Sequence, residues 1–363
     1  MSVSSKPKLI LDTFCEIYPM LKNYASGEFW DFGQEAVDPD GIYVIGRRQF
    51  IDHREKIREH VQHHGVKIIL SNPHEGSETL RGHISALYGI DDLVLANKIL
   101  LVGGGDMDPS WPCLRFDSFL SKIYDYEENI EAADRSAEIW QKINKPYKFL
   151  FLNGRSRRHR QYLINRWCQS NLLSTCLWTN LDTAAGAVNL LPNKYENNRY
   201  QNRHSMIGSS GYVKFDLFNQ EWGEIYLNPE QYIDTYFSVV TETVFDYPYS
   251  FRTEKIWKPI AIGHPWIAVA NQGFYRDLKN LGFKTFDGLI DESFDNIENN
   301  QQRLTAVASS VEQLANSDLD QFLVAAADIC KYNQEYFKEI SKQNRADFPD
   351  RFFKFLEKHK WMT

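Results

Sequence analysis

The sequence has no long hydrophobic run. Nowhere do about 18 apolar residues follow one another, the length that a helix needs to cross the apolar core of a membrane. The first residues, MSVSSKPKLILDTFC, have neither the long apolar core nor the cleavage pattern of a secretory leader. These absences predict a soluble, cytoplasmic protein without a transmembrane segment.

Cysteine is scarce and scattered along the chain. No C-x-x-C pair and no cysteine–histidine spacing of a zinc site occurs among the five cysteines, which are Cys15, Cys113, Cys168, Cys176 and Cys330. We therefore expect buried thiols in a reducing compartment.

Positive charge is also in deficit, because the net charge of the chain is −7. A protein that binds nucleic acid needs a broad positive surface to meet the phosphate backbone. We expect no nucleic-acid partner. Any anion that the protein binds should be small and held by a few local residues.

What the sequence does contain is an alternation of short apolar runs with helix-like stretches. At 363 residues, 43% of them hydrophobic, the chain is long enough for two domains of about 100–200 residues each. Each run is apolar enough to be a strand that is buried on both faces. The candidate strands are residues 8–14, 41–46, 66–72, 98–104, 148–154, 176–181, 236–243 and 265–271.

This β-α-β alternation predicts an α/β fold with parallel sheets covered by helices. We expect two Rossmann-like domains facing a cleft, with an acceptor-side domain at 1–140 and a nucleotide-binding domain at 141–340. A C-terminal helical segment, 341–363, would pack back across the domains. Ligands of open parallel sheets bind at the carboxyl ends of the strands, so the loops that follow the strands are the places to search for a site.

The loop after the run KFLFLNG is rich in arginine. Arg155, Arg157, Arg158 and Arg160 precede or begin a helix there. Their guanidinium groups would be repelled by the positive end of the helix dipole unless an anion were bound. Arg166 lies deeper in the same helix, where we expect a solvated basic face.

A second basic helix start occurs in FRTEKIWKP. In one interpretation Thr253 caps the helix and Glu254 favours its positive end, as on an ordinary surface. In the other, the free N–H groups of the helix start bind a phosphate with help from Arg252 and Lys255. Two basic helix starts in one half of an acidic protein suggest one polyanionic ligand, and a nucleotide diphosphate fits that description.

The run from residue 236 to 286, which contains this second helix start, resembles the donor-binding half of glycosyltransferases with the GT-B fold. It is most similar to the fucosyltransferase-like family, whose signature is a strand, a loop, a Thr-Glu-Lys helix start and a Gly-x-x-Pro before the next strand. A weaker likeness extends over residues 148 to 300.

The resemblance implies roles for particular residues. Glu254 and Lys255 would bind the ribose and the phosphates of the donor, and one of Arg155, Arg158 or Arg160 would help to hold the diphosphate. It also implies a nucleotide-sugar donor, such as one like GDP-fucose, and hexosyl or fucosyl transfer to a glycan or lipid-linked glycan acceptor in glycan biosynthesis.

Inverting transfer requires a carboxylate that takes the proton of the acceptor hydroxyl. Glu75, in the sequence PHEGSE, lies immediately past the end of a predicted strand and is our candidate, although an ordinary solvated turn residue would look the same. Because the basic helix starts can stabilise the leaving diphosphate, we expect neither a divalent metal nor another cofactor.

Two alternatives remain open. Asp106-Met107-Asp108 follows an apolar run and a triple glycine, and an Asp-x-Asp motif at such a place can hold Mg²⁺ or Mn²⁺ against a donor diphosphate. A metal-dependent glycosyltransferase is therefore one alternative. The other is a protein that binds nucleotide sugars or glycans and catalyses no reaction.

Overall fold

The computed structural model describes residues 7–34, 37–181, 189–195 and 226–362. The chain divides into an N-terminal unit, Met1–Ser118 with Lys342–Thr363, and a C-terminal unit, Phe119–Ser341. The boundary between the two units thus falls after residue 118, whereas the sequence suggested a boundary after residue 140. The reason is that the side chains of Phe119, Ile123 and Ile139 belong to the core of the C-terminal unit.

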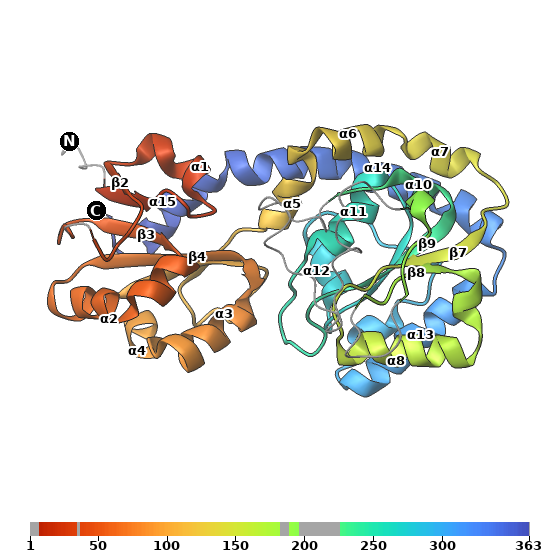
Figure 1. The fold of residues 1–363 in the computed structure, drawn as a ribbon, viewed down its shortest axis with the longest axis horizontal. Helices are drawn as coiled ribbons and strands as arrows, with labels where there is room; N and C mark the ends of the chain where they lie inside the picture. The colour runs from red at the N-terminus through yellow and green to blue at the C-terminus, as the bar shows by residue number, and fades with distance from the viewer. Residues whose placement is uncertain (1–6, 35–36, 182–188, 196–225, 363) are drawn as a thin grey trace. The chain divides into compact units, whose positions relative to one another are not determined.

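The N-terminal unit contains a parallel sheet. In the described part of the chain its six strands have the order β2-β1-β3-β4-β5-β6, and each pairs in parallel with its neighbours (Figure 1). The strands are β1 (Leu9–Asp12), β2 (Gly27–Phe29), β3 (Ile42–Gly46), β4 (Lys67–Gly76), β5 (Ile99–Gly104) and β6 (Cys113–Arg115). The helical elements are α1 (Tyr18–Leu21), η1 (Lys22–Tyr24), α2 (Arg47–His63), α3 (Ser77–His83), the π-helical turn η2 (Ile84–Tyr88), α4 (Asp91–Leu95) and α15 (Phe348–Lys358).

Helices cover both faces of this sheet. On one face, side chains of α2, α3 and α4 pack on alternate strand residues such as Ile45 and Ile68. On the other face, α1 and α15 pack on the residues between them, such as Val44 and Ile69. Burial of both faces explains why the central strands are continuous apolar runs.

The C-terminal unit contains a second parallel sheet. Its four strands among the described residues have the order β10-β9-β7-β8. They are β7 (Tyr147–Phe151), β8 (Leu177–Trp178), β9 (Thr235–Thr241) and β10 (Trp266–Val269). Every residue of β9 is buried, as expected for a central strand.

Helices of the C-terminal unit lie on both sides of its sheet (Figure 1). They are α5 (Ser118–Lys122), η3 (Ile123–Asp125), α6 (Glu127–Asp134), α7 (Ser136–Gln141), α8 (Arg158–Gln169), η4 (Leu172–Thr175), η6 (Asn193–Tyr195), α10 (Pro229–Ile233), α11 (Glu254–Ile262), α12 (Phe274–Asn280), η9 (Ser293–Asn296), α13 (Asn300–Ala315) and α14 (Leu319–Ala346), which runs on into the N-terminal unit. Arg166 of α8, expected on a solvated face, instead forms a two-pronged ion pair with Glu312 of α13, at 2.6 and 2.8 Å.

The structure confirms the predicted α/β class with two parallel sheets, and each of the apolar runs forms a strand. The predicted C-terminal helices are also present. Cys15, Cys176 and Cys330 are buried free thiols as expected, but Cys168 is exposed on α8. None of the helices in the described ranges is long and apolar enough to cross a membrane.

Candidate functional site

The C-terminal sheet has a topological switch point between β7 and β9. The chain leaves β7 through α8 toward β8 on one side, and it leaves β9 through α11 toward β10 on the other side. Right-handed crossovers that run in opposite directions place their helices on opposite faces and open a crevice at the carboxyl ends of the two central strands. The arginine-rich loop and the Thr-Glu-Lys segment both lie at this edge.

Helix α8 begins without a side-chain cap. Its N-cap residue, Arg157, has an extended backbone, and its side chain makes no capping hydrogen bond. Arg155, Arg157 and Arg158 are exposed around this helix start. Cations beside the positive end of a helix dipole are unfavourable by themselves, so this helix start favours an anionic ligand.

Arg160 is buried and holds the same loop in place through hydrogen bonds. Only 3% of Arg160 is exposed, and its guanidinium donates to the carbonyl oxygens of Arg155 and Thr241 at 2.9 Å and of Glu242 at 3.3 Å. Its Nε has no hydrogen-bond partner among the described residues. Burial, together with nearby Arg157, lowers the pKa of Arg160 to about 10, so the group stays charged at neutral pH. The β7–α8 loop is therefore tied to the end of β9 by a buried cation.

Helix α11 begins at a well-satisfied cap. The hydroxyl of Thr253 accepts from the N–H of Lys255 at 3.3 Å, and it donates to the buried carboxylate of Glu242 at 2.6 Å. The N–H of Thr253 donates to the other oxygen of Glu242 at 3.0 Å. Burial raises the pKa of Glu242, although Lys255 and Thr253 oppose that shift.

Glu254 and Lys255 form an ion pair at the first turn of α11. Lys255 Nζ lies 2.6 Å from Glu254 Oε1 and 3.2 Å from the Thr253 hydroxyl. Only 4% of Glu254 is exposed. Burial alone would raise the pKa of Glu254, but the charge and hydrogen bond of Lys255 outweigh it and hold the pKa below its usual value. Arg252, just before the cap, is completely buried.

Glu242 connects the two helix starts. Its carboxylate caps α11 through Thr253, and its carbonyl oxygen lies 3.0 Å from Nε2 of His159 on α8. The His159 ring stacks on Phe245 with 5.2 Å between ring centroids. Burial and the charge of Arg160 lower the pKa of His159 to about 3, so this imidazole is neutral at physiological pH and donates from Nε2.

The sequence-based search did not identify Glu242 or His159. The sequence did contain a signal for Glu242. This residue directly follows the apolar run YFSVVT, and loops that follow strands are where parallel sheets bind their ligands. His159 gave no such signal, since its partner lies 83 positions away in the chain. Of the predicted residues, Arg155, Arg158, Arg160, Arg252, Glu254 and Lys255 all lie at this single sheet edge.

The N-terminal sheet has a switch point of its own, between β1 and β3. From β1 the chain passes through α1 to β2, and from β3 it passes through α2 to β4 on the other side. The two strand ends are joined by Asp12, which accepts from the N–H of Gly46 at 3.0 Å and from the N–H of Phe14 at 2.9 Å.

Glu75 lies at the same edge of the N-terminal sheet. It is the penultimate residue of β4, rather than a loop residue past the strand end, because β4 continues to Gly76 through an irregularity that begins at Asn72. Its Oε1 lies 3.4 Å from Nη1 of Arg47, the first residue of α2, and about a third of its side chain is exposed. The carboxylate is thus held by one cation and remains open to solvent.

Tyr88 lies near this pair and was not predicted from the sequence. It ends the π-helical turn η2 and is only 4% exposed, and its hydroxyl has no hydrogen-bond partner in the described ranges. Burial raises the pKa of Tyr88, while the adjacent Arg47 lowers it. Turns of π-helix often occur at functional sites.

The aspartates of the Asp-Met-Asp motif have partners within the protein. Asp106 accepts from Arg115 at 2.6 Å, and Asp108 accepts from the backbone N–H of Ser110 at 2.9 Å. The backbone hydrogen bond from Ser110 lowers the pKa of Asp108. Over the described ranges, no group of three or more His, Cys, Asp or Glu side chains is placed to hold a metal ion.

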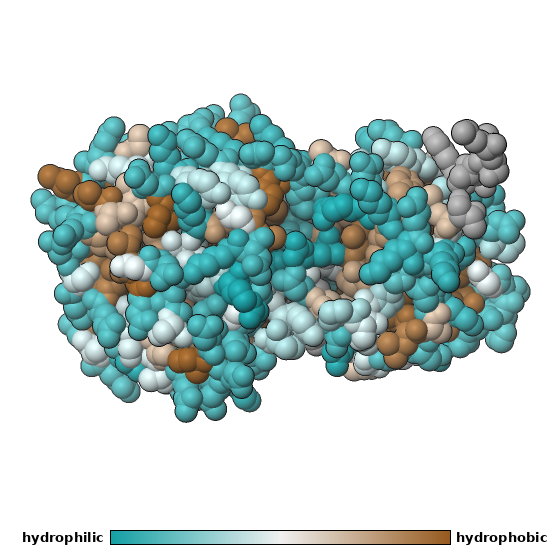
Figure 2. Space-filling model, turned by 180° about the vertical axis from the view of Figure 1, so that it is seen from behind, coloured by the Kyte–Doolittle hydropathy of each residue, from teal (hydrophilic) through white to brown (hydrophobic). Residues whose placement is uncertain are grey.

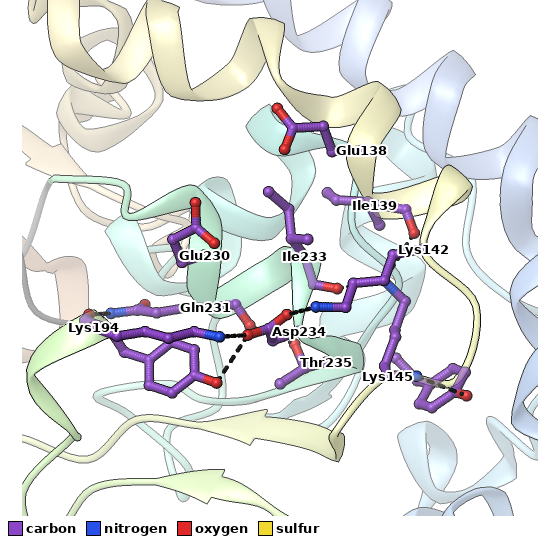
Figure 3. A network of polar contacts seen from close by, with 12 residues as sticks. Glu138, Ile139, Lys142, Lys145, Lys194, Glu230, Gln231, Ile233, Asp234 and Thr235 are labelled. Carbon is purple, nitrogen blue, oxygen red and sulfur yellow. Dashed lines mark hydrogen bonds and ion pairs between the residues drawn. The ribbon is translucent and has the colours of Figure 1, made fainter.

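A buried ion network stabilises the opposite, amino edge of the C-terminal sheet (Figure 3). Asp234 forms ion pairs with Lys142 and Lys194 and accepts from the hydroxyl of Tyr195 at 2.8 Å. Burial alone would raise the pKa of Asp234, but these three hydrogen bonds hold it below its usual value. Lys145 nearby donates to two backbone carbonyl oxygens, and burial lowers its pKa to about 8. These groups hold the start of β9 in place.

Comparison with known proteins finds no match to a family model, a curated protein or a solved structure. The two sheet edges described above are the places where the geometry of this chain gathers groups able to bind and to react.

Proposed function

We propose that this protein is a metal-independent, inverting glycosyltransferase of GT-B type. In this proposal the C-terminal unit binds a nucleotide-sugar donor, such as one like GDP-fucose, and the N-terminal unit binds the acceptor. The transferred group would be a hexosyl or fucosyl residue, and the acceptor a glycan or a lipid-linked glycan.

The observation that carries the proposal is the pair of helix starts at the switch point between β7 and β9. Exposed Arg155 and Arg158 surround the uncapped start of α8, and Lys255 lies on the first turn of α11. Cationic side chains outnumber the carboxylates Glu242 and Glu254 there. A diphosphate would neutralise this excess and bind the free N–H groups of α8.

The same groups suit the chemistry of the leaving diphosphate. When the bond between the anomeric carbon and the phosphate oxygen breaks, its electron pair stays on the diphosphate, and prearranged cations stabilise the charge that develops. Arg160 contributes a buried positive charge and keeps the loop in place through its carbonyl bonds. We assign direct contact with phosphate to Arg158 and Lys255, with Arg155 as an additional contact.

Glu75 would act as the general base. Its carboxylate takes the proton of the acceptor hydroxyl while that oxygen forms the new bond to the anomeric carbon, on the side opposite to the departing phosphate. The ion pair with Arg47 orients Glu75, and the exposure of its side chain leaves one oxygen accessible to an acceptor.

Glu254 is proposed to bind the ribose hydroxyls. Because Glu254 is almost fully buried and paired with Lys255, the ribose would have to approach the edge of this ion pair and share the carboxylate. A Glu254→Gln variant should then lose affinity for ribonucleotides more than for the matching deoxyribonucleotides. Equal losses for both would assign Glu254 a structural role at the helix start.

The proposal is tested by a thermal-shift screen of nucleoside diphosphates and sugar nucleotides. A ligand at 100 times its dissociation constant stabilises the folded state by about 2.7 kcal/mol, which raises the melting temperature measurably. Lys255→Ala should reduce the shift at the same ligand concentration, because weaker binding leaves the ligand at only about 1–10 times its dissociation constant. If no nucleotide or sugar nucleotide stabilises the protein, the proposed donor site is wrong.

Transfer activity should survive EDTA. The reason is that the cations at the switch point supply the charge stabilisation, while Asp106 is engaged by Arg115. Activity that is lost in EDTA and restored by Mn²⁺ would instead favour the metal-dependent alternative. Specific nucleotide-sugar binding without any transfer or donor hydrolysis would favour the non-catalytic alternative.

A further inference from the structure

The end of helix α2 carries three histidines within five residues. They are His60, His63 and His64, in the sequence HVQHHG, and short histidine-rich stretches of this kind often bind metal ions. Helix α2 leads into β4 of the N-terminal sheet, so its last turn lies at the amino end of that strand, opposite the edge that carries Glu75. The proposed function assigns no role to these histidines.

His60 and His64 are spaced so that their side chains lie on the same side of the helix. Residues four positions apart are neighbours on a helix surface. The two imidazole rings have centroids 5.1 Å apart, and their planes are inclined at 44°. His64 is exposed and His60 is half-buried. An ion from solvent can therefore reach the pair.

The separation of the two rings matches a shared metal ion. A zinc ion lies about 2.1 Å from an imidazole nitrogen, and thus about 3.2 Å from the centroid of that ring. Two rings that bind one ion at the tetrahedral angle therefore have centroids about 5.2 Å apart. The 5.1 Å between His60 and His64 is close to this distance. One ion can bind both rings once they turn their nitrogens toward it, without a movement of the backbone.

The surroundings of the pair favour a cation. The carbonyl groups at the carboxyl end of a helix carry partial negative charge, and His64 is the C-cap residue of α2. Glu59 attracts a cation to this place, whereas Lys56 repels one. The amine of Lys56 is engaged, because it donates to the carbonyl oxygen of Gly33 at 2.8 Å. Burial, followed by the charges of His64 and Lys56, lowers the pKa of His60, so at neutral pH its ring is in the neutral form that binds metals.

We propose that His60 and His64 form a binding site for a divalent transition-metal ion such as Zn²⁺ or Ni²⁺. These ions bind well to imidazole, while Mg²⁺ and Ca²⁺ prefer oxygen ligands. The described residues provide no group of three or more His, Cys, Asp or Glu side chains around an ion, so water completes the coordination. The bound ion joins the last turn of α2 to its C-cap residue and stabilises the N-terminal unit. This site is separate from the proposed transfer reaction, which is assigned to the opposite edge of the sheet.

A small hydrophilic ligand also suits the surface of the protein. On the face drawn in Figure 2, hydrophobic residues form small patches in a largely hydrophilic surface. Extended apolar patches are the usual docking sites of partner proteins and membranes. A hydrated metal ion needs no such patch, because the imidazole nitrogens hold it.

Metal binding is tested by titration calorimetry on the full-length protein without a histidine tag. Zn²⁺ and Ni²⁺ should each bind at one ion per chain, and Mg²⁺ should give no binding that depends on His64. His60→Gln and His64→Gln should each raise the dissociation constant of Ni²⁺ by about tenfold or more, because each leaves a single imidazole at the site. His63→Gln removes a neighbouring exposed histidine, so it is the matched control and should bind like the parent protein.

His64→Gln is the decisive variant. Its exposed ring can be removed without disturbing the core, whereas the His60 ring packs on Phe32 with 6.0 Å between centroids. The proposed site is wrong if neither ion binds the parent protein, if His64→Gln binds Ni²⁺ like the parent, or if His63→Gln weakens binding equally. Zn²⁺ should also raise the melting temperature of the parent protein more than that of His64→Gln, and equal shifts would overturn the site. Binding of sugar nucleotides in EDTA tests the proposed function separately.

Discussion

The carboxyl edges of the two sheets have the same topology and opposite chemistry. Both sheets are parallel, and both have a switch point between two central strands. At the C-terminal sheet, cationic side chains outnumber the carboxylates of the edge, and Glu242 accepts from Thr253 there, although Arg160 Nε has no hydrogen-bond partner among the described residues. At the N-terminal sheet, Glu75 is paired with Arg47 beside the exposed rings of Phe14 and Trp30, and the Tyr88 hydroxyl has no partner among the described residues.

In open parallel sheets, the topology sets where a ligand binds and the side chains set which ligand it is, so two edges of the same topology can bind different ligands. In the proposed function, the cationic edge of the C-terminal sheet is preorganised for a charged diphosphate. The proposed division between donor and acceptor sites rests on this contrast.

The largest expected effect comes from the carboxylate of the N-terminal edge. Glu75→Gln should lower kcat by about 10²–10⁴-fold, because the amide cannot take the proton of the acceptor hydroxyl. The dissociation constant of the donor should stay unchanged, since the proposed donor site is on the other sheet. Steady-state transfer kinetics and calorimetric donor binding measure the two quantities. Asp106→Asn is the control, and full activity of Glu75→Gln would remove Glu75 from the chemistry.

The second effect concerns the cationic edge. Lys255→Ala and Arg158→Ala should each weaken binding of a nucleoside diphosphate by about 10–100-fold, because each removes a charge-assisted hydrogen bond of about 1.5–3 kcal/mol. Titration calorimetry measures the change. Lys331→Ala, at an exposed position on α14, is the control and should bind like the parent protein. An unchanged dissociation constant for either variant would exclude that residue from the site.

Much of the fold could be predicted from the sequence because buried parallel strands are continuous apolar runs. The short strands β2 and β6 could not be predicted, since each has three residues and neither is an apolar run. The end of β4 was also missed, because the irregularity after Asn72 carries the strand through proline and polar residues to Gly76.

The candidate sites were predictable only in part, for a related reason. Parallel topology alone brings Arg158 and Lys255 to one sheet edge, so their common location follows from the strand pattern. The burial of Arg160 does not follow from it, because that depends on bonds to the carbonyl oxygens of Thr241 and Glu242, more than 80 positions away. Side-chain pairing across the fold leaves no periodic signal in the sequence.

The third prediction tests the internal bonding of the cationic edge. Glu242→Ala should lower the free energy of unfolding of the C-terminal unit by about 1–3 kcal/mol, because it leaves the N–H and hydroxyl of Thr253 without their buried acceptor. Hydrogen exchange at the amides of α11 measures the change. Glu335→Ala, at an exposed position of α14, is the control.

Glu242 should also give this stability a pH dependence. Burial raises the pKa of Glu242 in the folded state, so the folded state binds its proton more tightly than the unfolded state does. The resulting stabilisation is complete below the ordinary pKa of glutamate and is lost as the pH rises through the folded-state pKa. Glu242→Gln should remove this part of the pH profile, and a profile identical to that of the parent protein would contradict the assignment.

The smallest effect is expected at the N-terminal edge, from Tyr88→Phe. Because the Tyr88 hydroxyl is buried and has no hydrogen-bond partner among the described residues, its removal should leave the free energy of unfolding unchanged or raise it. The same substitution at Tyr275 should cost about 1–3 kcal/mol, because the Tyr275 hydroxyl accepts from the buried N–H of Ala268 at 2.7 Å. Chemical unfolding of the Tyr88→Phe and Tyr275→Phe variants measures the two changes in the free energy of unfolding. Equal losses of stability in the two variants would show that the Tyr88 hydroxyl has a hydrogen-bond partner within the protein.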